Sequence, residues 1–204
     1  MNLQAAWKDI EYYIGQGISV LPVHDTNNDG RVAKSPAIAK WNQLQSKRFT
    51  PEEMFNAMER ANTGAFGIIA GQISGNLEII DIDTKFREGI DTALFDDIRS
   101  MYPDIWEKLR IHRTPSGGHH ILYRVKDVPV EGNRKIAGYY NAEGKETYFI
   151  ETRGEGGYVV APPSLGYSVT HGRPIPTLTL FEKNSLMSLC RSYNETYKVQ
   201  KEKQ

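Results

Sequence analysis

The chain has 204 residues, enough for one sizeable domain or for two small modules that share a core. Its 25 basic and 25 acidic residues give a formal net charge of zero, so polyanion binding must come from local patches. A single cysteine, Cys190, excludes an internal disulfide and a cysteine-based zinc site, and fits a reducing, cytoplasmic setting. No apolar run approaches the roughly 20 residues of a membrane span and no signal peptide is apparent, so we expect a soluble intracellular protein.

The first part of the chain predicts a helix, a strand and a second helix. Apolar residues at helical spacing predict a helix over 5–15, and a short strand follows over 18–23. Thr50, Pro51 and Glu53 are typical of a helix start, because they supply an N-cap, a proline in the first turn and a capping box.

Two apolar strands follow, over 65–71 and 76–84, with only four residues between them. Such a short connection favours either a hairpin or two neighbouring strands of one buried sheet. A helix is then predicted over about 88–101, where apolar residues recur on one stripe before a Tyr-Pro pair ends the pattern.

From residue 110 onward the pattern changes to short runs rich in aromatic and β-branched residues, divided by Pro, Gly and Asn clusters. These runs predict strands over 110–114, 120–125, 147–153, 158–161 and 167–170. The segment over 126–144 is expected to be a mobile connection or a twisted hairpin. The tail is expected to be helical from 184 to about 197.

The pattern as a whole predicts an α+β fold. It opens with an α/β half over about 1–75 and continues with a mostly β half over 76–183. A C-terminal helix and a charged tail over 184–204 follow, and the tail could lead to a linker.

The strand over 76–84 ends in two carboxylates, Asp81 and Asp83. Side chains two apart on a strand share a face, so both acids point the same way while Ile80 and Ile82 face the opposite layer. Two adjacent carboxylates repel each other unless a cation lies between them, and Mg²⁺ or Mn²⁺ prefers such oxygen ligands. On its own, however, such a pair is more typical of an ordinary solvated strand end.

A Pro-Ser-Gly-Gly turn between two predicted strands brings Ser116, Gly117, Gly118 and His120 into a small space. Glycines let a phosphate approach the backbone closely, and the N–H groups of such a turn can bind an anion. The alternative is a plain hairpin turn. His119 and His120 face opposite ways if both lie in a strand, so at most one of them points into a site.

Glu151 and Arg153 share a face by the same alternation. The acid could add a third carboxylate to a metal site, and the guanidinium could neutralise a phosphate. Alternatively, the two are a same-strand ion pair worth at most ~1 kcal/mol at a surface.

Three motifs in order carry a resemblance to a known family. Asp81-x-Asp83, then Ser116-Gly117-Gly118-x-His120, then Glu151-x-Arg153 resemble the bifunctional primase-polymerase (prim-pol) branch of the archaeo-eukaryotic primase superfamily. The resemblance extends over roughly residues 5–167. It implies a single catalytic domain over 1–183, in which an N-terminal α/β module packs on an RRM-like, mostly antiparallel module and the active site lies between them.

The resemblance also implies roles for the motif residues. Asp81, Asp83 and Glu151 would be catalytic ligands of two Mg²⁺ or Mn²⁺ ions, without zinc, and Glu151 stands where many relatives have Asp. His120 would contact the triphosphate of the incoming nucleotide. The other nucleotide-binding candidates are Ser116, Gly117, Gly118 and Arg153, and the candidates for template contacts are Lys34, Lys40, Arg134, Lys135 and Tyr139.

The activity implied is that of a DNA primase/polymerase, which transfers nucleotides from NTPs or dNTPs to a 3′-hydroxyl on a template. The implied partners are a single-stranded DNA template with its primer, nucleoside triphosphates, and a helicase domain in the same polypeptide or in trans. The implied setting is the replication of a plasmid, phage or mobile element, in the cytoplasm and away from membranes. Two alternatives stay open: a metal-dependent nuclease or phosphohydrolase, and a non-catalytic nucleic-acid-binding module of a helicase-primase.

Overall fold

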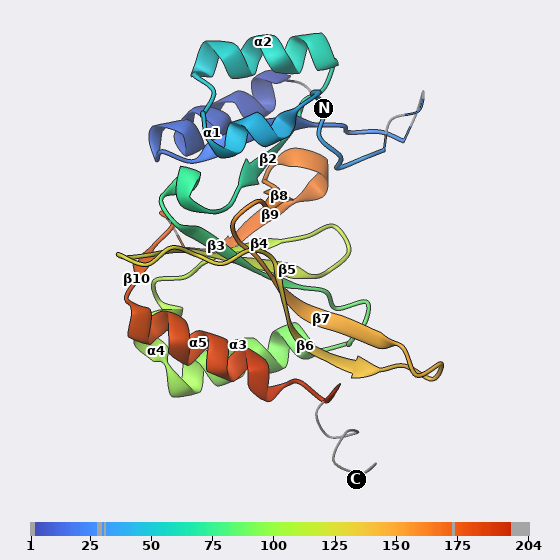
Figure 1. The fold of residues 1–204 in the computed structure, drawn as a ribbon, viewed down its shortest axis with the longest axis vertical. Helices are drawn as coiled ribbons and strands as arrows, with labels where there is room; N and C mark the ends of the chain where they lie inside the picture. Colours follow the sequence, from blue (N-terminus) through green and yellow to red (C-terminus); the bar gives the residue numbers. More distant parts are fainter. Residues whose placement is uncertain (1–2, 28–29, 31, 173, 197–204) are drawn as a thin grey trace.

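The computed structural model describes residues 3–27, 30, 32–172 and 174–196, which form two β-sheets and two layers of helices (Figure 1). The smaller sheet contains β1 (Ser19–Val23), β2 (Ala65–Ile69) and β8 (Tyr158–Val160), in that spatial order. The larger sheet has the order β6 (Arg134–Tyr140), β7 (Glu146–Arg153), β3 (Leu77–Ile82), β5 (His119–Val125), β4 (Arg110–Arg113) and β9 (Ser168–His171). The short β10 (Thr177–Leu178) pairs with β5 and is the parallel neighbour in an otherwise antiparallel sheet. The predicted α+β class is confirmed.

Helices α1 (Leu3–Gly15) and α2 (Pro51–Ala61) cover the smaller sheet (Figure 1). The predicted start of α2 is confirmed. The Thr50 side chain accepts from the Glu53 N–H at 3.1 Å, and the Glu53 carboxylate accepts from the Thr50 N–H at 2.9 Å. Buried side chains of both helices share one cluster with Leu77 and Ile79 of β3, so this layer packs on one face of the larger sheet.

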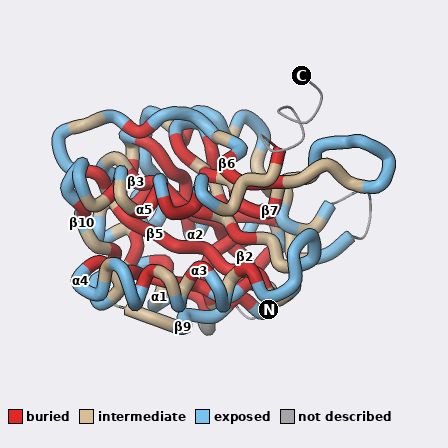
Figure 2. The backbone as a smooth tube through the Cα atoms, turned by 90° about the horizontal axis from the view of Figure 1, so that it is seen from below, coloured by how far each residue is buried: buried red, intermediate tan, exposed pale blue. Residues whose placement is uncertain are grey.

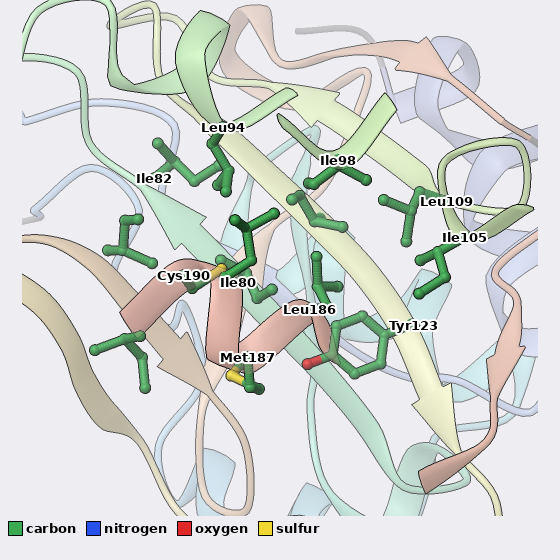
Figure 3. Close-up of a cluster of buried hydrophobic side chains, with 14 of the residues drawn as sticks. Ile80, Ile82, Leu94, Ile98, Ile105, Leu109, Tyr123, Leu186, Met187 and Cys190 are labelled. Carbon is green, nitrogen blue, oxygen red and sulfur yellow. The ribbon is translucent and has the colours of Figure 1, made fainter. Parts of the chain in front are cut away.

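The opposite face of the larger sheet is covered by α3 (Ile90–Met101), α4 (Pro103–Trp106) and α5 (Leu180–Ser192) (Figure 1). Figure 3 shows Ile80 and Ile82 of β3 in the cluster that this face buries, together with Leu186 and Cys190 of α5. Both isoleucines are at most 1% exposed, which confirms that they face the core. Most of the strand backbone is buried, whereas the outer turns are exposed (Figure 2).

Both alternatives predicted for β2 and β3, a hairpin or neighbouring strands of one sheet, are wrong. The two strands form no hairpin and belong to different sheets. The short 3₁₀ helix Gln72–Ser74 redirects the chain, and the bridge between Gly71 and Leu77 is isolated. β2 instead pairs with β8, whose residues follow much later in the chain, so the smaller sheet draws on both halves of the sequence.

Two other predictions for loop and tail segments are refined. The segment over 126–144 contains β6, which pairs with β7 through register shifts between Lys135 and Gly138, so the twisted hairpin is the alternative confirmed. The C-terminal helix starts at Leu180 rather than at 184, because Thr179 and Glu182 form a capping box. The predicted end of that helix near 197 and the tail beyond it lie outside the described residues.

The remaining 3₁₀ helices are Trp41–Gln45 and Ser164–Gly166. No helix in the described part of the chain has both the length and the apolar character needed to cross a membrane.

Candidate active site

A row of polar side chains crosses the larger sheet, with Asp81 at its centre. Asp81 of β3 lies opposite His120 of β5 on one side and opposite Glu151 of β7 on the other. The row continues from His120 to His112 of β4 and from Glu151 to Lys135 of β6. Directly opposed residues of antiparallel strands point to the same face, so these side chains share the face that α1 and α2 partly cover.

Arg153 lies between the two central carboxylates. Its Nη2 donates to Oδ2 of Asp81 at 3.0 Å and to Oε2 of Glu151 at 2.8 Å. The side chains of Asp81, Glu151 and Arg153 are 23%, 30% and 31% exposed, so the ion pairs are largely shielded from water. The shared face predicted for Glu151 and Arg153 is confirmed, and the two side chains form the ion pair that was the alternative interpretation of this stretch.

Asp83 lies just beyond the end of β3, where its backbone N–H donates to the Phe149 carbonyl at 2.9 Å. Its carboxylate pairs with Lys85, whose Nζ lies 2.9 Å from Oδ2. Within the described ranges, no three carboxylate, imidazole or thiol groups converge closely enough to hold a metal ion.

The chemistry of the three carboxylates nevertheless fits a divalent cation. Asp81, Asp83 and Glu151 line the same cavity and offer only oxygen atoms, which hard cations such as Mg²⁺ and Mn²⁺ prefer. Each of the three now pairs with a cationic side chain of the chain, either Arg153 or Lys85.

His120 is buried beside Asp81, with its Nε2 3.6 Å from Oδ1 of the carboxylate. Burial lowers the pKa of this imidazole to about 4 and outweighs the opposite effect of Asp81, so His120 is neutral at pH 7. It can therefore contact a phosphate through a hydrogen bond rather than through charge. His119 faces the other layer, where its Nδ1 lies 3.3 Å from Asp91 of α3, so only one of the two histidines points into the site as predicted.

The Pro-Ser-Gly-Gly turn lies beside the end of β3. A Cβ on Gly118 would come within 2.3 Å of the Ile82 carbonyl oxygen, so only glycine lets the turn approach this closely. Gly117 has a φ of 91°, which also favours glycine. The exposed Ser116 has its Oγ 3.0 Å from the Thr114 hydroxyl. None of the described residues of this turn lines a cavity that includes Asp81.

Two cavities meet at Asp81 and Arg153. The first, of about 460 Å³, is lined by Lys34, Trp41, Asp81, His120, Asn133, Arg153, Gly156, Gly157, Tyr158, Val159, Val160 and Tyr167. The second, of about 430 Å³, lies toward the β6–β7 hairpin and includes Asp83, Lys135 and Glu151. We call the first the aromatic cavity and the second the hairpin cavity.

The aromatic cavity combines ring faces with cations. Trp41 and Tyr158 pack edge to face with ring centroids 5.1 Å apart, and Lys34 Nζ lies 5.5 Å from the centroid of Tyr167. The Tyr167 ring in turn lies 5.6 Å from the His120 ring. Bases stack on aromatic rings and phosphates pair with cations, so this cavity has the chemistry to take a nucleotide.

The sequence did not single out Trp41, Tyr158 or Tyr167 as site residues. They come from segments far apart in the chain, and no local spacing connects them.

The candidates for template contacts divide into three groups. Lys34 lines the aromatic cavity and Lys135 the hairpin cavity, whereas Lys40 lines neither in the described residues. Arg134 is held by Glu131 at 2.9 Å and by buried Glu78 at 3.3 Å, and Tyr139 packs on the core beside Phe149. These last two side chains therefore have structural partners.

A family model described as bifunctional DNA primase/polymerase, N-terminal, matches residues 10–179, which is most of the chain. A search of curated proteins gives no significant match.

Proposed function

Since the chain belongs to the bifunctional DNA primase/polymerase family, we propose that it transfers nucleotides from NTPs or dNTPs to a 3′-hydroxyl on a DNA template. The observation that carries this proposal is that Asp81 lines both the aromatic cavity and the hairpin cavity, where Asp83 and Glu151 also lie. Asp81 lies at the wall of that cavity, opposite His120 and Glu151, so a nucleotide held there would have its phosphates beside the acids.

The three carboxylates Asp81, Asp83 and Glu151 would hold Mg²⁺ or Mn²⁺, with two ions in the active complex. Bound ions of this kind lower the pKa of an attacking hydroxyl and stabilise charge on the transferring phosphate. Asp81 and Glu151 lie opposite each other in the sheet and line the hairpin cavity together with Asp83, which supports this assignment.

The nucleotide contacts that we propose come from both sides of Asp81. His120 would donate a hydrogen bond to a phosphate oxygen, and Arg153 would supply a charge that pairs with the triphosphate. Trp41 and Tyr158 would stack on the base or pack against its edge. The backbone of Gly117 and Gly118 and the hydroxyl of Ser116 remain candidates for the outermost phosphate, because the turn lies at the end of β3.

The fold supports a finer proposal about the architecture. The larger sheet would be the RRM-like catalytic module of an archaeo-eukaryotic primase fold. Helices α3, α4 and α5 cover one of its faces, and the row of polar side chains around Asp81 lies on the other. Residues 1–183 would form a single catalytic domain with the site between its 1–75 and 76–183 parts. The hydroxyl of Tyr13 in α1, which lies 3.3 Å from His112 at the end of the row, supports this packing.

The family resemblance is also the basis of the biological setting that we propose, the replication of a plasmid, phage or mobile element in the cytoplasm. The partners would be a primed single-stranded DNA template, nucleoside triphosphates and a helicase domain in the same polypeptide or in trans.

The experiment is an incubation with primed DNA, a labelled dNTP and Mn²⁺, followed by product separation. Chain growth with release of pyrophosphate supports the proposal. Release of mononucleotides from DNA alone would favour a nuclease that uses the same carboxylates with water. Binding of DNA with neither product would favour a non-catalytic module.

A further inference from the structure

Every carboxylate of the proposed metal site is paired with a cation that belongs to the chain, but the pairs differ. Lys85, which pairs with Asp83, has a side chain that is 59% exposed. Such a surface pair is weak and easily separated. Arg153 instead bridges two carboxylates from neighbouring strands, at 3.0 Å from Asp81 and 2.8 Å from Glu151, in a largely shielded position. Arg153 is thus the cation that keeps these two acids close together.

The aromatic cavity offers the guanidinium of Arg153 a second position, away from the two acids. Its backbone is fixed at the end of β7, where it lies opposite Ile79 of β3. Its side chain lines both the aromatic cavity and the hairpin cavity. A Cβ on Gly157 would lie 2.4 Å from Asn133 Oδ1 and 3.2 Å from the Cβ of Arg153, so glycine at this position avoids crowding at the base of the Arg153 side chain. Rotation of the side chain alone could move the charge from the acids into the aromatic cavity.

We propose that Arg153 is a displaceable internal counter-ion, which holds Asp81 and Glu151 together until a divalent cation takes over these two carboxylates. The displaced guanidinium then turns into the aromatic cavity and pairs with the phosphates of the nucleotide. This inference rests on the proposed function, because it uses the same acids and the same nucleotide site. It adds that a single side chain couples cation binding to nucleotide binding.

The coupling has a definite sign. Without nucleotide, the cation must break two ion pairs of Arg153, which lowers the apparent affinity for the cation. With nucleotide, the guanidinium finds new partners, so the cation binds more tightly, and by linkage the cation raises the affinity for nucleotide by the same factor. The opposing idea is that Arg153 stays on the acids and only preserves their spacing.

The test measures Mn²⁺ binding to the whole chain in the absence of DNA and nucleotide. The EPR signal of free Mn²⁺ reports how much of the ion is bound. We expect Arg153→Gln to bind Mn²⁺ about tenfold more tightly than the wild type, because the competing charge is gone. Repeated with a non-hydrolysable dATP analogue, the experiment should show a several-fold gain in Mn²⁺ affinity for the wild type and a much smaller gain for Arg153→Gln. Unchanged or weaker Mn²⁺ binding by Arg153→Gln would overturn the counter-ion role.

Two further variants make the outcome specific. Lys85→Gln removes the exposed cation beside Asp83 and should change the Mn²⁺ affinity by less than about threefold. Arg153→Lys keeps the charge without the fork that bridges two acids, so its affinity should lie between those of the wild type and Arg153→Gln. It also serves as the test variant if Arg153→Gln does not fold.

Asp81→Asn separates this inference from the proposed function. Mn²⁺ binding that does not depend on Asp81 would overturn the metal site itself. Loss of Mn²⁺ binding in Asp81→Asn, together with no gain in Arg153→Gln, would overturn only the counter-ion role.

Discussion

His120 and Asp81 face each other across β5 and β3, and the imidazole Nε2 lies 3.6 Å from the carboxylate Oδ1. A carboxylate at this distance normally raises the pKa of a histidine. Here burial has the larger effect and lowers the pKa to about 4, with Arg153 and Lys34 acting in the same direction as burial. The site therefore keeps a neutral imidazole next to its central acid.

The low pKa of His120 predicts a specific loss of stability in acid. The unfolded chain binds a proton near pH 6.5 and the folded chain only near pH 4, so stability is complete above pH 6.5 and falls as the pH drops toward 4. A shift of this size corresponds to about 3 kcal/mol. In urea unfolding at pH 4.5 and 7.5, His120→Gln should lose clearly less stability than the wild type. Some loss should remain, because burial also lowers the pKa of His112. If the free energy of unfolding changed equally with pH in both proteins, the low pKa of His120 would be contradicted.

Glu78 is fully buried on the opposite face of β3, where it ties three elements together. Its carboxylate lies 3.2 Å from Lys183 Nζ of α5 and 3.3 Å from Arg134 Nη2 of β6, and it accepts from the Tyr123 hydroxyl at 2.8 Å. Removal of the acid takes the carboxylate partner away from buried Lys183, so Glu78→Ala should lower the free energy of unfolding by about 3–5 kcal/mol. Glu131→Ala removes the exposed partner of Arg134 and should cost less than about 1 kcal/mol. Urea unfolding of both variants gives the comparison, and equal losses would contradict the network.

Gly118 allows the Ser-Gly-Gly turn to pack against the end of β3. In Gly118→Ala the new Cβ would lie 2.3 Å from the backbone oxygen of Ile82, so the turn must move. We expect a loss of about 1–3 kcal/mol in the free energy of unfolding. Gly15→Ala is the matched control, since a Cβ there meets nothing within 4 Å, and its effect should stay within about 0.5 kcal/mol. Thermal or urea unfolding checks both, and a neutral Gly118→Ala would show that the turn is not closely packed.

The aromatic cavity predicts a nucleotide-binding defect when Trp41 is removed. Stacking of a base on an aromatic ring contributes about 1–3 kcal/mol, so Trp41→Ala should raise the KM for the nucleotide about tenfold and leave kcat nearly unchanged. Phe181→Ala removes an aromatic side chain that is 78% exposed on α5 and lines neither cavity in the described residues, so it should leave the KM unchanged. Steady-state kinetics with all four dNTPs measures this. A Trp41→Ala variant with a normal KM would place the base elsewhere.

Much of the fold was predictable wherever the signal is local. The capping box at Thr50 and Glu53 marks the start of α2 because its hydrogen bonds are made within one turn. Alternation along β3 correctly separates buried Ile80 and Ile82 from Asp81, since it depends only on the geometry of one strand.

The pairing of strands was not predictable in the same way. β2 pairs with β8, so that Ile68 lies opposite Val159, although the much nearer β3 looked like its partner. Packing of the helices decides that choice, because α1 and α2 bury the same cluster that holds Ile68 and Val159. The site shows the same limit. The motifs predicted Asp81, His120 and Glu151 as site residues. Tyr167 is part of no such motif and lies beside His120 only because of the tertiary fold.

The central claim is that Asp81 serves a nucleotidyl-transfer site, and primer extension by wild type and Asp81→Asn tests it most directly. The assay follows a labelled dNTP on primed DNA with Mn²⁺, and Asp96→Asn, an exposed acid of α3, is the control. We expect the wild type and Asp96→Asn to lengthen the primer and release pyrophosphate, and Asp81→Asn to be slower by about a hundredfold or more. No extension by the wild type, or equal extension by Asp81→Asn, would contradict the claim.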